Sequence, residues 1–182
     1  MKKLIKKILK EEVKNWWEKY SKPTENQTNY IVFVAGTNKT GISHQKQYNA
    51  FLNSLGAPPP NTEIKLFNYN DHLHSNSELF QFLKENLLNV EALVLFSAAC
   101  SMGNKLTPRY VPHTMVYCIE PWATENGKLS WDNIYHANFY VNCCSWRRGK
   151  GAMKGIPEEN KNNLTGTDAH INALKDAVSK IF

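Results

Sequence analysis

Short apolar stretches alternate along the chain with longer stretches in which apolar residues recur every three or four positions. The short stretches are rich in β-branched and aromatic residues and predict buried β-strands over residues 30–34, 64–69, 92–96, 114–119, and 138–141 with Cys143. The longer stretches predict helices over residues 45–55, 77–88 and 169–181. Strands that alternate with helices form βαβ units. We therefore expect an α/β protein with a three-layer, doubly wound, mostly parallel sheet and helices on both faces.

The first 22 residues follow a different pattern, because their apolar positions form one stripe beside a stripe of lysines. The apolar positions are Leu4, Ile5, Ile8, Leu9, Val13, Trp16, Trp17 and Tyr20. This spacing predicts a basic amphipathic helix over 1–22, followed by a polar linker over 23–29 and the α/β domain over 30–182. We expect the helix to pack on the domain. The alternative is that residues 2–20 bind an anionic membrane surface.

Composition and charge narrow the classes of function. A length of 182 residues fits one domain. The net charge is +6, but residues 1–22 contain eight lysines and three glutamates, so the rest of the chain is nearly neutral. We therefore expect no nucleic-acid partner.

The predicted location follows from two further features. Lysines interrupt the first apolar residues, so this segment predicts neither a signal peptide nor a membrane span. The four cysteines lack C-x-x-C or zinc-ribbon spacing. The sequence thus predicts a reduced, cytoplasmic protein, with peripheral membrane binding as the alternative.

Ser97 is the strongest candidate for chemistry because it directly follows the apolar stretch 92–96. Parallel sheets place their reactive groups at the carboxyl ends of such strands. A tight strand-to-helix turn needs small neighbours, and Ala99 provides one of them. Leu95 stands where the G-x-S-x-G motif has its first glycine. An ordinary buried strand that ends in a hydrogen-bonded serine is the competing interpretation.

Three segments occur in a meaningful order. A loop of small residues follows the first strand, Ser97 follows the middle strand, and His170 precedes the last helix. This order resembles that of the α/β-hydrolase family, specifically its minimal lidless lipases and esterases, over residues 30–182. The resemblance implies a serine hydrolase that cleaves a small-molecule ester or amide through an acyl-enzyme, with no cofactor and no metal.

The same resemblance assigns roles to individual residues. Ser97 would attack the substrate carbonyl, and His170 would accept and return the proton. The backbone N–H groups of Ala98 and of Thr37 or Asn38 would bind the oxyanion.

The third member of the triad is the weakest part of the match, because no carboxylate follows strand 138–141. We favour Glu120, which ends the preceding strand, over Asp132 and Asp168. Asn142 is a further candidate, because an amide can orient a histidine without carrying charge.

Ser101 is an alternative nucleophile, because its surroundings fit a small-x-Ser-x-Gly pattern more closely. Only five residues separate Ser101 from Thr107 and the proline after it, whereas nine follow Ser97 up to Leu106. A longer helix can direct its N-terminus at an oxyanion. We therefore favour Ser97.

Two further classes of function stay open. The segment 36–43 is similar to a phosphate-binding loop, but Ile42 stands where such a loop has lysine, so a flavodoxin-like nucleotide- or phosphate-binding module is one of them. The second is a non-catalytic α/β-hydrolase-like binding protein. Its binding residues would be Trp122, Trp131, Trp146, Arg147 and Arg148. His72 and His74 lack a third metal ligand nearby, so we expect no metal there.

Overall fold

A parallel β-sheet forms the centre of the protein. The computed structural model describes residues 28–38, 42–71, 77–86, 88–102, 114–121, 139–142, 164 and 168–182. Within them lies a five-stranded sheet with the order β2-β1-β3-β4-β5, and every strand pair is parallel. Strands and helices alternate along the chain, so the predicted α/β class is confirmed. The predicted helix over 1–22 and most of the predicted linker lie outside the described residues.

The strands lie close to the apolar stretches that predict them. Their bounds are β1 Asn29–Ala35, β2 Thr62–Asn68, β3 Val90–Phe96, β4 Met115–Ile119 and β5 Phe139–Asn142. The central strands β1 and β3 are buried along their last five residues. Strands covered on both faces need such continuous apolar runs, which is why the sequence pattern identifies them. The edge strand β2 is more polar and mostly half-buried.

Helix α2 (His44–Leu55) has clear signals at both ends. The Ser43 hydroxyl accepts a hydrogen bond from the Lys46 N–H at 3.2 Å, which caps the first turn. Gly56 ends the helix with a φ of 71°, a conformation that glycine adopts without strain.

The other helices are α3 (Glu78–Glu85) and α6 (Ala169–Ile181). Helix α3 ends before the predicted residue 88, and Asn86 caps it: its backbone N–H and its side-chain amide donate hydrogen bonds to the Phe82 carbonyl at 3.0 Å and 2.9 Å. None of the helices in this part of the chain is both long and apolar enough to cross a membrane.

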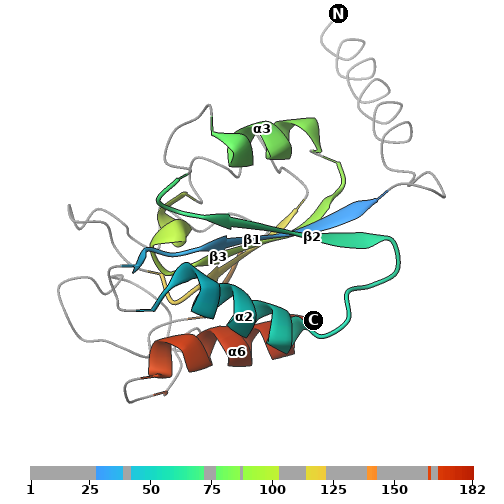
Figure 1. Cartoon of the computed structure of the whole chain (residues 1–182). Helices are drawn as coiled ribbons and strands as arrows, with labels where there is room; N and C mark the ends of the chain where they lie inside the picture. Colours follow the sequence, from blue (N-terminus) through green and yellow to red (C-terminus); the bar gives the residue numbers. More distant parts are fainter. Residues whose placement is uncertain are drawn as a thin grey trace, which may run out of the picture.

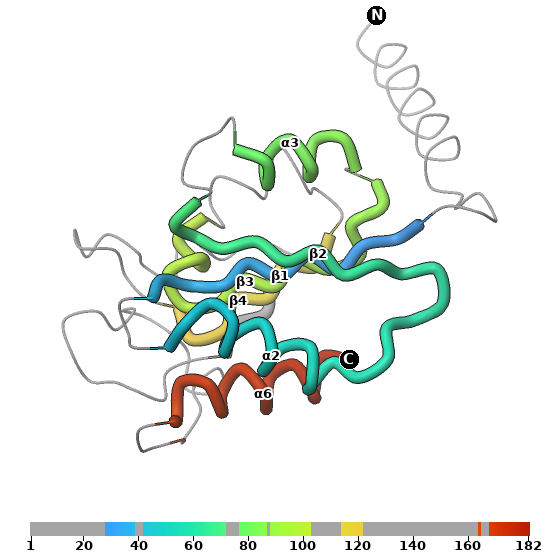
Figure 2. Tube along the Cα trace, viewed as in Figure 1, coloured from blue at the N-terminus to red at the C-terminus, as the bar shows by residue number. Residues whose placement is uncertain are grey.

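The helices divide between the two faces of the sheet. Helices α2 and α6 lie side by side along one face, and α3 lies over the other (Figure 1). The tube view shows the same arrangement, with α6 in red beside α2 in teal (Figure 2). Each face therefore has its own apolar core.

Alternate residues of β1 and β3 supply these two cores. Val32 and Leu93 face α3, whereas Phe33 and Val94 face α2 and α6, as the period of a β-strand requires. The Phe33 ring stacks on the ring of Phe51 from α2, with 4.4 Å between centroids and 9° between planes. This contact fixes α2 over β1.

Because all strands are parallel, their carboxyl ends share one edge of the sheet. The register pairs Val34 of β1 with Leu95 of β3, and Phe96 of β3 with Ile119 of β4. The residues that directly follow these strands are therefore neighbours. They are Gly36, Ser97 and Glu120.

We predict that Phe51→Ala lowers the free energy of unfolding by about 3–5 kcal/mol, because it removes a fully buried ring from the core and leaves a cavity. Urea denaturation measures this loss. Leu66→Ala, at a position with 36% exposure, is the control and should change the value by less than about 1 kcal/mol. Equal losses in the two variants would contradict this description of the core.

Candidate active site

Ser97 stands at a sharp turn at the end of β3. Its φ is 55°, a left-handed conformation that is uncommon for residues other than glycine. A 3₁₀-helix, η2 (Ser97–Met102), begins at the same residue, so the chain passes from strand to helix without a linker. Ala98 and Ala99 are buried, and Ser97 itself is 3% exposed. The nucleophilic serine of α/β-hydrolases stands on a strained strand-to-helix turn of this kind.

The helix after Ser97 differs from the expected one. The described part of the expected nine-residue helix, Ser97–Met102, is a 3₁₀-helix, and the remaining residues 103–106 lie outside the described residues. Short 3₁₀ segments are frequent as connectors between longer elements. In the described residues, the left-handed turn distinguishes Ser97 from Ser101.

Gly36, the first residue after β1, lies directly against Ser97. A Cβ atom at Gly36 would lie 2.6 Å from the Ser97 Cβ and 2.9 Å from the Phe96 carbonyl oxygen. Such distances are too short for any side chain, so only glycine fits here. The loop after β1, which includes Thr37 and Asn38, thus starts in contact with the candidate nucleophile.

Glu120, which follows β4, and His170 of α6 form a buried pair. The Glu120 Oε2 atom lies 3.0 Å from the His170 Nδ1 atom, and the two residues are 50 positions apart in the sequence. Glu120 is fully buried, and His170 is 8% exposed in the first turn of α6. A buried carboxylate is costly unless it is hydrogen-bonded or paired, and this contact meets that need.

The orientation of His170 suits a base. Its ring packs on the Phe96 ring with 4.6 Å between centroids, and Phe96 directly precedes Ser97. In the neutral tautomer that donates its Nδ1–H to the Glu120 carboxylate, Nε2 carries the lone pair that can accept another proton. Ser97 and Glu120 thus follow adjacent strands, and His170 contacts Glu120 and the residue before Ser97.

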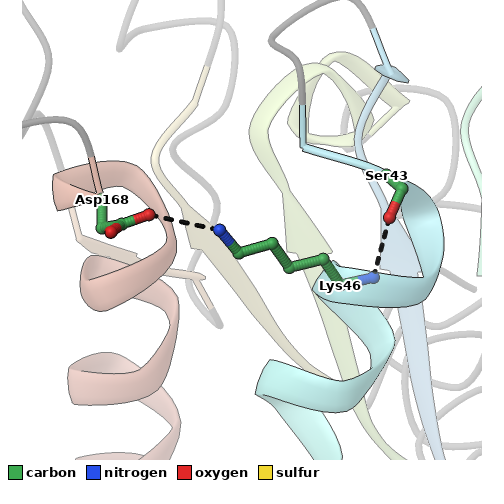
Figure 3. Close-up of polar contacts among 3 residues, drawn as sticks. All are labelled: Ser43, Lys46 and Asp168. Atoms are coloured by element: carbon green, nitrogen blue, oxygen red, sulfur yellow. Dashed lines mark hydrogen bonds and ion pairs between the residues drawn. The ribbon is translucent and has the colours of Figure 1, made fainter.

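Asp168, which the sequence also offers as the acid, has a different partner. Its carboxylate pairs with the Lys46 Nζ atom of α2 at 3.2 Å, and both side chains are more than half exposed (Figure 3). Asp168 lies at the start of α6, two residues before His170. Of the two candidate acids that the structure describes, Glu120 contacts His170, whereas Asp168 contacts Lys46.

Asp132 and Asn142 are the two remaining candidates for the residue that orients the histidine. Asp132 lies outside the described residues. Asn142 is the last residue of β5, paired in register with Ile119 of β4, and only its backbone is described.

Ser101, the alternative nucleophile, lies inside η2 and not at its start. Its hydroxyl donates a hydrogen bond to the Ala98 carbonyl at 2.8 Å and lies 3.3 Å from the Tyr69 hydroxyl. The first bond is a local one within the helix. The left-handed turn and the contact with Gly36 belong to Ser97 alone of these two serines.

The predicted oxyanion donors lie near Ser97 in the chain or in the adjoining loop. Ala98 follows Ser97 directly and is buried. Thr37 is half-buried, and Asn38 is exposed. The Asn38 Oδ1 atom accepts a hydrogen bond from the His44 N–H at 2.9 Å, which holds this loop to the start of α2.

The cysteines at this edge suit packing better than catalysis. Cys100 and Cys118 are buried free thiols. Burial and the neighbouring Cys118 raise the pKa of the Cys100 thiol well above its ordinary value. Cys100 therefore stays protonated and lies 3.2 Å from the Leu95 carbonyl oxygen. Cys143 and Cys144 lie outside the described residues.

Within the described ranges, no three histidine, cysteine, aspartate or glutamate side chains are grouped as metal ligands would be. His72 and His74 lie outside these ranges. So do Trp122, Trp131, Trp146, Arg147 and Arg148.

Two residues of this region, Gly36 and Gln47, are not identified by the sequence patterns. The contact of Gly36 with Ser97 is set by the register of β1 and β3, which no local pattern encodes. Gln47 had a readable signal, because it shares one face of α2 with the apolar residues Ala50 and Phe51. A polar residue on the apolar stripe of a helix indicates a specific hydrogen-bonding role.

No protein-family model, curated protein or solved structure gives a significant match to this chain.

We predict that Glu120→Ala lowers the free energy of unfolding by about 3–5 kcal/mol, because it breaks a buried pair. Asp168→Ala removes an exposed ion pair and should cost less than about 1 kcal/mol. Urea denaturation of both variants at one pH measures the difference. Similar values for the two variants would contradict a stabilising role for the buried pair.

Proposed function

We propose that this protein is a serine hydrolase of the α/β-hydrolase type that cleaves an ester or amide through an acyl-enzyme. Ser97 is the nucleophile, His170 the general base and Glu120 the acid. One observation carries the proposal: Ser97, in a left-handed strand-to-helix turn, and Glu120 directly follow two adjacent strands, and His170 contacts both Glu120 and the ring of Phe96, the residue before Ser97. Nucleophile, base and orienting acid are recognised by this kind of arrangement.

The residues suggest the following reaction. The Ser97 hydroxyl oxygen bonds to the substrate carbonyl carbon while the His170 Nε2 atom accepts its proton. His170 then donates this proton to the leaving alcohol or amine, and the acyl group stays on Ser97. Water attacks the acyl-enzyme in the same way and regenerates the serine. Glu120 holds the Nδ1–H of His170 and stabilises the imidazolium that forms in each half-reaction.

The negative charge on the carbonyl oxygen needs donors during both steps. We assign this role to the backbone N–H groups of Ala98 and of Thr37 or Asn38. Support comes from the position of Ala98 directly after Ser97 and from the close contact of Gly36 with Ser97. Because Ser97, Glu120 and His170 are all buried, electrostatic interactions among them are stronger than in water.

The proposal also includes the architecture of the whole domain. We infer a three-layer, doubly wound domain over 30–182, with the basic helix over 1–22 packed on it. The strand order and the positions of α2, α3 and α6 support the three-layer arrangement, whereas the packing of the basic helix stays a prediction.

The strand order of the sheet is one observation that favours a nucleotide-binding module. The order β2-β1-β3-β4-β5 is also that of flavodoxin-like proteins, which bind phosphate groups where β1 and β3 diverge. In this protein Gly36 and Ser97 are in contact at that point, and a Cβ atom added at Gly36 would lie 2.6 Å from the Ser97 Cβ atom. Ile42 stands where a phosphate-binding loop has its lysine, and we therefore favour the hydrolase.

The nucleophile is tested with a fluorophosphonate probe and a short-chain nitrophenyl ester. We predict that the probe labels Ser97 and that Ser97→Ala lowers ester turnover by at least about 10³-fold, because the covalent step is lost. Ser101→Ala is the matched control and should keep both labelling and turnover. Labelling of Ser101, or turnover retained in Ser97→Ala, would overturn the assignment.

The acid is tested separately. We predict that Glu120→Gln lowers kcat by about 10²–10⁴-fold, because the amide cannot stabilise the imidazolium and can favour the wrong histidine tautomer. Asp168→Asn removes the other described carboxylate near His170 and should change kcat by less than about 2-fold, since Asp168 contacts Lys46 in place of His170. A normal rate in Glu120→Gln would transfer the role to Asp132 or Asn142.

A further inference from the structure

Gln47 is a buried amide in the first turn of α2 that the proposed chemistry does not use. It is 1% exposed and lies among apolar residues. Burying an amide costs free energy unless its polar atoms are hydrogen-bonded. Both ends of this amide have partners, and both partners belong to the backbone around one loop.

The two hydrogen bonds of Gln47 connect the ends of the segment between β1 and α2. The Gln47 Oε1 atom accepts a hydrogen bond from the Gly36 N–H at 2.8 Å. The Gln47 Nε2 atom donates one to the Ile42 carbonyl at 3.0 Å. Thr37 and Asn38 lie between these two anchor points in the sequence.

The first of these bonds acts at the point of contact with the nucleophile. The backbone of Gly36 lies directly against Ser97, and the Gly36 N–H donates a hydrogen bond to the Gln47 side chain. Gly36 therefore cannot supply the oxyanion donor, and that role goes to the residues after it. The position of those residues relative to Ser97 then depends on how firmly Gly36 is held.

We infer that Gln47 is a positioning residue that holds the loop after β1 against Ser97, so that its backbone donors meet the oxyanion. This inference rests on the proposed hydrolase function. Oxyanion donors act only when they lie about 2.7–3.1 Å from the developing charge. A shift of about 1 Å in such a group can lower the rate by about 10²-fold. Gln47 fixes the loop from a rigid helix, which limits such shifts.

The test replaces Gln47 with leucine, which keeps the approximate volume and removes both hydrogen bonds. Gln47→Leu should lower kcat for a short-chain nitrophenyl ester by about 10–100-fold and leave KM within about 2-fold. The reason is that oxyanion donors bind the transition state and not the bound substrate. Gln45→Leu makes the same change at a more exposed position of the same helix and should leave both constants unchanged.

A second variant separates positioning from folding. Gln47→Glu keeps an oxygen that can accept the Gly36 N–H bond, so its kcat should lie closer to that of the unchanged protein than the kcat of Gln47→Leu does. Amide hydrogen exchange at Gly36 gives a readout that needs no activity, and Gln47→Leu should speed this exchange. If Gln47→Leu does not fold, Gln47→Glu decides, because it loses the hydrogen bond to the Ile42 carbonyl: its kcat should fall below that of Gln45→Leu, and an equal kcat would overturn the positioning role.

The outcomes distinguish this inference from the proposed function. If the unchanged protein hydrolyses the ester through Ser97 but Gln47→Leu keeps a normal kcat, the positioning role is wrong and the hydrolase stands. A rise in KM with a constant kcat would also overturn it. If the unchanged protein neither hydrolyses the ester nor reacts with the fluorophosphonate, the proposed function fails, and the inference fails with it.

Discussion

The buried contact between Glu120 and His170 is the interaction on which the site depends. It joins the end of β4 to the start of α6 across 50 positions of sequence. Apolar packing can dock α6 on the sheet in several nearby positions, but a short polar contact in a dry environment allows few of them. The pair also sets the orientation of the imidazole ring against Phe96. Burial of apolar side chains thus stabilises the packing of α6 on the sheet, and the Glu120–His170 contact selects the position of α6.

Much of the fold could be predicted from local patterns. Helix α6 has the bounds that its apolar spacing predicts, and α2 ends at the glycine that marks its end. The strands β1 and β3 are continuous apolar runs because both faces of a central strand are covered. Helix α3 is shorter than predicted, and Asn86 caps its end through the backbone N–H and the side-chain amide, which both bond the Phe82 carbonyl. Periodicity identifies an element, whereas single side chains decide where it ends.

The candidate site could be predicted only in part. The carboxyl ends of parallel strands meet at one edge, so the grouping of Ser97 and Glu120 follows from the order of elements. The order of elements does not distinguish Glu120 from Asp168, because the choice depends on which carboxylate is buried against His170. The contact between Gly36 and Ser97 depends on the register of two strands that are far apart in the sequence, and no local pattern carries that register.

Backbone strain is concentrated where the proposed chemistry lies. Ser97 and Glu120 follow adjacent strands, and both have positive φ angles, at 55° and 53°. Each such residue costs about 1–2 kcal/mol relative to a right-handed conformation. Asn61 shares this conformation, but asparagine tolerates it in ordinary turns. A serine and a glutamate do not gain stability from it, so the surrounding packing must impose it. The left-handed turn directs each side chain away from its strand, and the buried contact with His170 shows where that of Glu120 is directed.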